Sequence, residues 1–304
     1  MSSGRPRAYV YGMTVLSTVH RLAGPYPPQD SYQEIERTWL IPGGEAGNAA
    51  ILLACWGVTA HLAGPALGRV TAHPLTEALS QLGVECEGLH VDGSFDGYQD
   101  LVLMDGQTRT VFGWFEKLAS DPVRRWSPPD PRRISEADIA TVDPFLGADS
   151  VRAAEHCLAA ATPYVTIDCA AESLLHRGAA ATVLSGEYLR GQPGGDKPEL
   201  VLRRYQNTSS GLCVVTAGSG VIRYGRGDAS PRQLLPFRVR EQGTLGAGDA
   251  FRAGIAYGVL ANWTDERTVR FAAAASALVC ARGPIATGPP TLEQILSFAE
   301  RRSS

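Results

Sequence analysis

Short, β-branched apolar runs alternate with helical stretches along most of the 304-residue chain, and this alternation constrains the fold more than any other feature. We expect strands over residues 8–15, 58–63, 139–142, 164–167, 182–184 and 212–216, and helices over 45–56, 72–82, 150–161 and 198–205. Three further helical stretches, 247–261, 265–280 and 292–301, end the chain. Strands that alternate with helices usually pair in parallel and are covered on both faces. The sequence therefore predicts an α/β fold with a mostly parallel central sheet, and we expect residues 1–304 to form one domain.

Residues 98–114 depart from this alternation. Two strand-like runs meet there at Asp105-Gly106, a residue pair that favours tight hairpin turns. Residues 30–41 offer another extended segment. Trp114 and Phe115 end the hairpin, where their rings could stack on a ligand or pack in the core.

Composition favours small-molecule chemistry. The formal net charge is −3 and the arginine pairs are isolated, which argues against nucleic acid as the main partner. Neither a membrane span nor a signal peptide is expected, because long apolar runs and a basic N-terminal segment are absent from the sequence. The six cysteines form no Cys-x-x-Cys pair and the six histidines are dispersed. We expect buried free thiols, no zinc site and a cytoplasmic protein.

A glycine-rich turn, Gly246-Ala247-Gly248, precedes Asp249 at the start of a predicted helix. Small side chains let backbone amides approach an anion, and the helix dipole favours negative charge at the same point. Asp249 could then take the proton of a hydroxyl that accepts a phosphoryl group, or it could simply cap the helix. Phe251 stands where a dinucleotide fingerprint needs its third glycine, and the chain lacks the Gly-Lys-Ser/Thr of a P-loop.

The segment Gly243–Gly254 resembles the second signature of the ribokinase (pfkB) family of sugar and nucleoside kinases, except that Gly243 replaces a leading Asp. The run Pro42–Ala50, continued by Cys55-Trp-Gly, resembles the first signature of that family. The turn Thr216–Gly220 is similar to the family's nucleotide loop, with its glycines spaced one residue differently. The resemblance covers essentially the whole chain and implies a ribokinase-like fold and an ATP- and magnesium-dependent kinase.

On the acceptor side, the resemblance implies that Gly43 and Gly44 let a polyol lie against the backbone while Asn48 bonds a hydroxyl. Ser17 falls near the place of the family's substrate-binding Asp. Asp30 could supply the missing carboxylate or be an ordinary loop residue, and Trp114 could contact the ligand.

On the donor side, the resemblance implies nucleotide contacts from four residues of two turns: Ser185, Thr216, Gly218 and Gly220. Glu187 would help to organise the magnesium ion. Asp168 ends a strand and is either a site residue or a helix cap. Gly243 removes a ligand for the monovalent cation that activates some members of the family, so dependence on potassium stays open.

The sequence thus predicts transfer of the γ-phosphoryl group of ATP to a hydroxyl of a small sugar or sugar-like polyol. The residues 246–248 would hold the developing charge, with Asp249 as the general base. Segments 29–42 and 95–116 would form a β-lid that excludes water and could join two subunits into a homodimer. A nucleoside kinase and a non-catalytic sugar-binding homologue are the alternatives.

Overall fold

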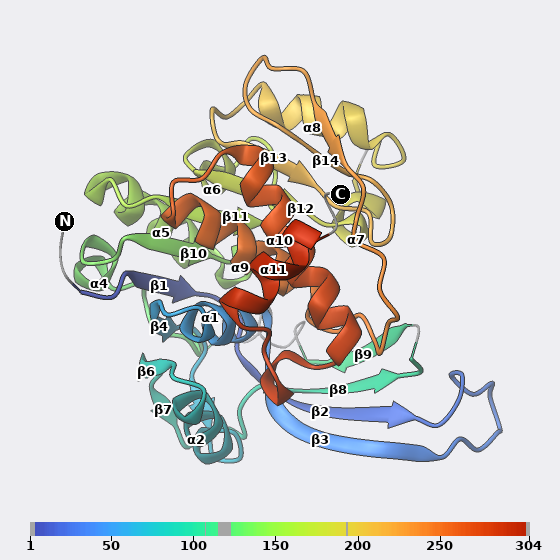
Figure 1. Ribbon diagram of the computed structural model, residues 1–304. Coiled ribbons are helices and arrows are strands. Elements are labelled where there is room, and N and C mark those ends of the chain that lie inside the picture. The colour runs from blue at the N-terminus through green and yellow to red at the C-terminus, as the bar shows by residue number, and fades with distance from the viewer. Residues whose placement is uncertain (1–3, 107, 115–122, 193, 302–304) are drawn as a thin grey trace.

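The central sheet is the largest feature of the computed structural model, which describes residues 4–106, 108–114, 123–192 and 194–301 (Figure 1). Within these residues nine strands pair in the order β15-β14-β13-β12-β11-β10-β1-β4-β6. Their bounds are β1 (Arg7–Tyr11), β4 (Thr59–Ala63), β6 (Glu85–Gly88), β10 (Ile139–Val142), β11 (Tyr164–Ile167), β12 (Ala181–Leu184), β13 (Leu212–Val215), β14 (Ile222–Gly225) and β15 (Arg232–Leu234). In this order the seven neighbouring strands from β13 through β1 to β6 pair in parallel. Strands β14 and β15 extend the sheet in antiparallel pairing. The predicted α/β class is confirmed.

A second sheet of four strands lies beside the central one, in the order β3-β2-β8-β9 (Figure 1). It consists of β2 (Val15–Leu22), β3 (Ile35–Gly43), β8 (Gln99–Met104) and β9 (Arg109–Gly113). Strands β2 and β8 pair in parallel, and each outer pair is antiparallel. The β8–β9 pair is the predicted hairpin. A short parallel pair, β5 (Leu67–Gly68) and β7 (Val91–Asp92), stands apart from both sheets.

The prediction of one strand over residues 8–15 is wrong. Strand β1 ends at Tyr11, and Val15 already begins β2 in the second sheet. Between them the Met13 amide donates to the Asp143 carboxylate at 2.8 Å. A Cβ on Gly12 would lie 1.9 Å from the same carboxylate, so only glycine fits there. A remote aspartate therefore draws the chain out of the central sheet.

The seven predicted helices are confirmed, with slightly shifted ends. They are α1 (Glu45–Cys55), α2 (Ala72–Gln81), α5 (Ala148–Ala160), α8 (Pro198–Gln206), α9 (Ala247–Leu260), α10 (Asp265–Arg282) and α11 (Leu292–Arg301). Short elements that were not predicted are α4 (Pro131–Ser135), α6 (Leu174–Arg177), α7 (Gly186–Arg190) and 3₁₀ turns at Pro144–Leu146 and Ile285–Thr287. Such short segments carry too little apolar periodicity to be read from sequence. No helix of the described residues is both long enough and apolar enough to span a membrane.

The two faces of the sheet bury different helices. Val10 of β1 packs in a core that includes α1, α9 and α10, whereas Tyr9 and Tyr11 point into a core shared with α5. Helices α9 and α10 approach closely because Gly254 has no side chain. An added Cβ there would lie only 2.6 Å from the Cα of Ala272. This close packing holds the N-terminus of α9 at the end of the sheet.

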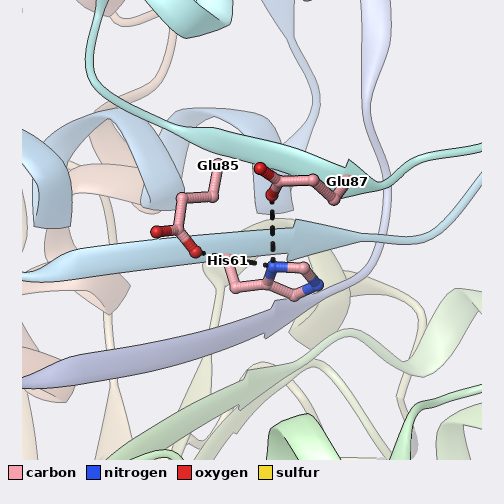
Figure 2. A group of neighbouring side chains, drawn as sticks. All are labelled: His61, Glu85 and Glu87. Carbon is pink, nitrogen blue, oxygen red and sulfur yellow. Dashed lines mark ion pairs between the residues drawn. The ribbon is translucent and has the colours of Figure 1, made fainter.

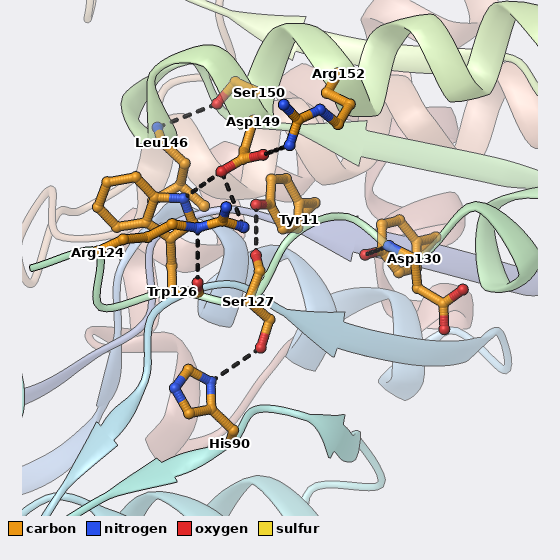
Figure 3. Close-up of polar contacts among 11 residues, drawn as sticks. Tyr11, His90, Arg124, Trp126, Ser127, Asp130, Leu146, Asp149, Ser150 and Arg152 are labelled. Carbon is orange, nitrogen blue, oxygen red and sulfur yellow. Dashed lines mark hydrogen bonds and ion pairs between the residues drawn. The ribbon is translucent and has the colours of Figure 1, made fainter.

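The segment 123–130, which leads from the second sheet toward α4 and β10, is tied to the first turn of α5 (Figure 3). Asp149 is buried, and its carboxylate accepts a hydrogen bond from Trp126 Nε1 at 2.9 Å. Arg124 Nη2 and Arg152 Nη1 lie 3.0 and 2.6 Å from the same carboxylate. Asp149 therefore serves packing rather than chemistry, because three donors already surround it.

Candidate active site

A cavity of about 620 Å³ lies where the C-terminal ends of the central strands meet the second sheet and the start of α9. Ile167 of β11, Val183 of β12 and Thr216 after β13 line it from the central sheet, and Ile41 and Val111 line it from the second sheet. Ligand sites of open α/β sheets lie at this edge. The cavity is therefore the candidate active site.

The glycine-rich turn forms one wall of the cavity. Gly246 has φ 79°, in the left-handed region, and an added Cβ would lie 2.7 Å from Ile285 Cδ1, so both backbone and packing require glycine. Helix α9 starts at the next residue. Its first amides have no acceptor within the helix and carry the positive end of the dipole. Gly246 and Gly248 line the cavity, whereas Ala247 does not. This wall suits an anion.

Asp249 lies in the first turn of α9 and also lines the cavity. Its Oδ2 accepts a hydrogen bond of 2.7 Å from Asn48 Nδ2. Asn48 reaches this point from α1, which follows Gly44 at φ 82°, where an added Cβ would lie 2.4 Å from the Met13 carbonyl oxygen. The Asn48 amide, which the sequence assigned to a substrate hydroxyl, thus holds the carboxylate of Asp249.

A buried ion pair between Arg252 and Asp143 stabilises the first turns of α9, and it was not predicted from the sequence. Arg252, one turn after Asp249, is 1% exposed and pairs with the fully buried Asp143. The guanidinium also donates to the backbone carbonyl of Glu45. Burial, followed by the charges of Asp249 and Asp143, raises the pKa of Glu45 to about 8. The sequence did hold one sign of this ion pair, because an arginine stands inside the otherwise apolar run Ala-Phe-Arg-Ala-Gly.

The acceptor side predicted from sequence comes together at the base of the second sheet. Ser17, Gly43, Gly44 and Asn48 all line the cavity. The Ser17 hydroxyl sits against Gly43, where an added Cβ would lie 2.1 Å from Oγ.

The second sheet also brings two unpredicted side chains, Asp100 and Arg109, to the same cavity. Sequence gave no sign of them, because a charged residue on a hairpin strand is ordinarily a solvated one.

On the donor side, Asp168 has φ 40°, and its carboxylate accepts two hydrogen bonds from Ser185. The Ser185 backbone nitrogen donates to Oδ1 at 2.7 Å and the Ser185 hydroxyl donates to Oδ2 at 2.8 Å. Burial raises the pKa of Asp168, and the two bonds from Ser185 oppose that shift. The Ser185 hydroxyl in turn accepts from the Tyr188 amide at 3.0 Å and caps α7. Asp168 therefore joins the ends of β11 and β12 instead of capping a helix. Glu187 lines the cavity with a side chain that is 75% exposed and lies 3.7 Å from Arg109 Nη2.

Other predicted site residues are not part of the cavity wall. Asp30 is exposed at φ 59°, and Trp114 is 47% exposed. Gly218 and Gly220 lie in the turn after β13, of which only Thr216 lines the cavity. Phe115 lies outside the described residues.

A separate cluster places His61 beside the carboxylates of Glu85 and Glu87 (Figure 2). His61 Nδ1 lies 3.7 Å from a Glu85 oxygen and 3.8 Å from a Glu87 oxygen, and donor atoms of the three residues lie within 4.8 Å of one another. Burial, then the nearby Arg133, lowers the pKa of His61. Arg133 lines the same small pocket as His61, where its charge opposes a bound cation.

The thiols of the chain are free. Cys157, Cys169 and Cys213 are buried, and Cys55, Cys86 and Cys280 are half-buried. The expectation of free thiols is confirmed for all six cysteines. The expectation that they are buried is confirmed in full for Cys157, Cys169 and Cys213.

Known structures share this architecture. Arabidopsis thaliana ribokinase, complexed with ribose and ATP, matches with a TM-score of 0.77 at 17% identity, over 98% of this chain and 99% of that chain. Burkholderia thailandensis nucleoside kinase, in complex with inosine, matches with a TM-score of 0.73 at 17% identity, over 97% of this chain and 96% of that chain. At these identities the likeness shows the fold alone.

Sequence comparison adds a family. The 5-dehydro-2-deoxygluconokinase of Geobacillus kaustophilus (strain HTA426) is 29% identical over 105 residues, which span 34% of this chain and only 31% of that protein. The profile of the pfkB family carbohydrate kinases matches residues 9–292. Because that match covers both sheets and the α9 turn, the protein belongs to the pfkB family of carbohydrate kinases.

Proposed function

We propose that the protein transfers the γ-phosphoryl group of ATP to a hydroxyl of a small sugar or sugar-like polyol. The observation that carries this proposal is the position of Asp249, on the cavity wall beside Gly246 and Gly248 at the N-terminus of α9. A base and an anion-binding turn then face one space. Both are needed when an alcohol attacks a phosphoryl group.

Asp249 would accept the proton of the attacking hydroxyl. The hydrogen bond from Asn48 holds Oδ2, which leaves Oδ1 to accept that proton. The amides at the start of α9 would hold the charge of the terminal phosphate, and their orientation costs nothing at the moment of reaction. In this division of labour the hydrogen bond from Asn48 of α1 to Asp249 of α9 would orient the base.

The donor set fits a magnesium ion on the side of Glu187. Magnesium is usually held by one or two carboxylates together with substrate phosphates and waters. Glu187 presents an exposed carboxylate on the cavity wall, whereas both oxygens of Asp168 already accept bonds from Ser185. When bound, the ion would neutralise charge on the nucleotide phosphates. Ser185 and Thr216 would lie along the nucleotide.

The second sheet would act as a lid over the acceptor and as a contact between two subunits. Leu40 and Phe112 of its outer strands share one register row through Thr18 and Leu101, and they are 59% and 48% exposed. Exposed apolar side chains on one face of a sheet often mark a protein interface. A homodimer by light scattering that becomes monomeric in Leu40→Glu would support this; a monomeric wild type would contradict it.

A nucleoside is the second candidate acceptor. Phe145 is 44% exposed and lines the cavity, so its ring could stack on a base. The acceptor is therefore to be sought among both classes.

The test is ADP formation with magnesium and ATP in the presence of D-ribose, D-fructose, myo-inositol or inosine. Asp249→Asn should keep its fold and nucleotide binding while kcat falls about 10²- to 10⁴-fold, the usual effect of removing a general base. Asp228→Asn, on an exposed turn, is the matched control and should behave as wild type. ADP formation by no acceptor, or unchanged turnover in Asp249→Asn, would overturn the proposal.

A further inference from the structure

A second carboxylate lines the cavity, on the side of the lid. Asp100 belongs to β8, where it is the register partner of Ser17 on the parallel strand β2. Partners in register point to the same face of a sheet, and both side chains line the cavity. The two residues therefore form one polar patch on its wall.

One oxygen of the Asp100 carboxylate lacks the hydrogen-bond partner that a buried carboxylate needs. Only 9% of the residue is exposed, and its Oδ1 is buried without a hydrogen-bond partner among the described residues. Burial raises the pKa of Asp100, and the Ser17 hydroxyl partly opposes the shift. A buried polar group without donors is unfavourable, so one kept in a cavity wall points to a ligand.

The neighbouring strands supply no cation to Asp100. Its register partner on β9 is Gly113, which has no side chain, and on β2 it is Ser17. Arg109, the cation of this hairpin that lines the cavity, lies instead 3.7 Å from Glu187. Among the described residues no donor for Oδ1 is found, which leaves this oxygen to the contents of the cavity.

We propose that Asp100, together with the Ser17 hydroxyl, binds the acceptor and selects a neutral polyhydroxy compound that presents hydroxyl donors to the lid side of the cavity. This inference rests on the proposed kinase function. A carboxylate accepts hydrogen bonds from two neighbouring hydroxyls, and it repels an acceptor that carries a carboxylate or phosphate at the same end. Asp30, the alternative considered from sequence, lies outside the cavity wall.

The test compares wild type with Asp100→Asn, which keeps the shape but loses the charge. For the best neutral acceptor among D-ribose, D-fructose and myo-inositol, KM should rise about 10- to 100-fold, as expected for the loss of charged hydrogen bonds. The KM for ATP should stay unchanged, and the preference for the neutral acceptor over D-gluconate should shrink. The control Asp105→Asn alters the turn of the same hairpin and should leave both KM values unchanged.

Calorimetric titration of the same sugars without nucleotide separates this inference from the kinase proposal. If wild type forms no ADP, phosphoryl transfer fails as a proposal, yet sugar binding that is lost in Asp100→Asn still supports the role of Asp100. Equal sugar affinity in both proteins, or no sugar binding by wild type, overturns it. An Asp100→Asn enzyme with an unchanged acceptor KM overturns it as well.

Discussion

Asn48 donates a hydrogen bond of 2.7 Å from Nδ2 to Oδ2 of Asp249 and so joins the first turns of two helices that are far apart in the sequence. Each helix follows a glycine with positive φ, Gly44 at 82° and Gly246 at 79°. A Cβ on Gly246 would also lie 3.8 Å from Asn48 Nδ2. The two glycines thus bring both helix starts to the same point.

Replacing Asn48 should impair turnover through Asp249. In Asn48→Ala the carboxylate loses its fixed orientation, and we expect kcat to fall about 10- to 100-fold with an unchanged KM for ATP. In Asn48→Asp two carboxylates share one site and cannot both ionise cheaply, so the acid limb of the pH–rate profile should move to higher pH. Steady-state kinetics across pH measures both effects. A wild-type profile in Asn48→Asp would contradict the contact.

The pair of Arg252 and Asp143 should dominate the stability of the site. Removing one partner leaves an uncompensated buried charge, so Arg252→Met should lower the free energy of unfolding by about 3–5 kcal/mol. Asp143→Asn in the same chain should restore part of that loss. Arg232→Met is the control, because Arg232 is 64% exposed where it pairs with Glu266, and it should cost less than about 1 kcal/mol. Equal losses in urea unfolding of the two arginine variants would refute the role of burial.

Glu45 should make stability depend on pH. Its pKa is raised to about 8 in the folded protein, whereas an unfolded glutamate titrates near a pKa of about 4.3. Between these values the folded state binds the extra proton, so the stabilisation is complete at low pH and is lost as pH rises toward 8. Urea unfolding from about pH 5 to pH 8 should show a fall in the free energy of unfolding that is shallower in Glu45→Gln. Identical slopes would rule out this account of Glu45.

Gly243 replaces the leading Asp of the family signature, and Met104 of the second sheet fills the space. Gly243 has φ 154°, and an added Cβ would lie 2.1 Å from Met104 Cε of β8. Gly243→Asp should therefore lower the free energy of unfolding by about 1–3 kcal/mol. Met104→Ala should reduce that penalty, and a double-mutant cycle by urea unfolding measures the coupling. Strictly additive effects would show that the two residues do not compete.

Much of the fold could be predicted because its main elements carry local patterns. The seven long helices and most parallel strands follow from apolar periodicity, and Asp105-Gly106 predicted its hairpin. The errors fall where tertiary contacts override the pattern. Residues 8–15 read as one strand, but the bond from Met13 to Asp143 directs the second half into the other sheet. Strands β14 and β15 are short antiparallel additions without a clear pattern.

The sequence by itself determined where the glycine-rich turns lie and that Gly246, Gly248 and Asp249 adjoin one helix start, because positive φ and helix N-termini are local properties. Only the tertiary structure decided that Asp100 lies beside Ser17, that Asn48 holds Asp249 and that Arg252 pairs with Asp143. These three contacts depend on strand register and helix packing between distant segments. Register and packing are set by how whole faces bury against one another, which no short stretch of sequence encodes.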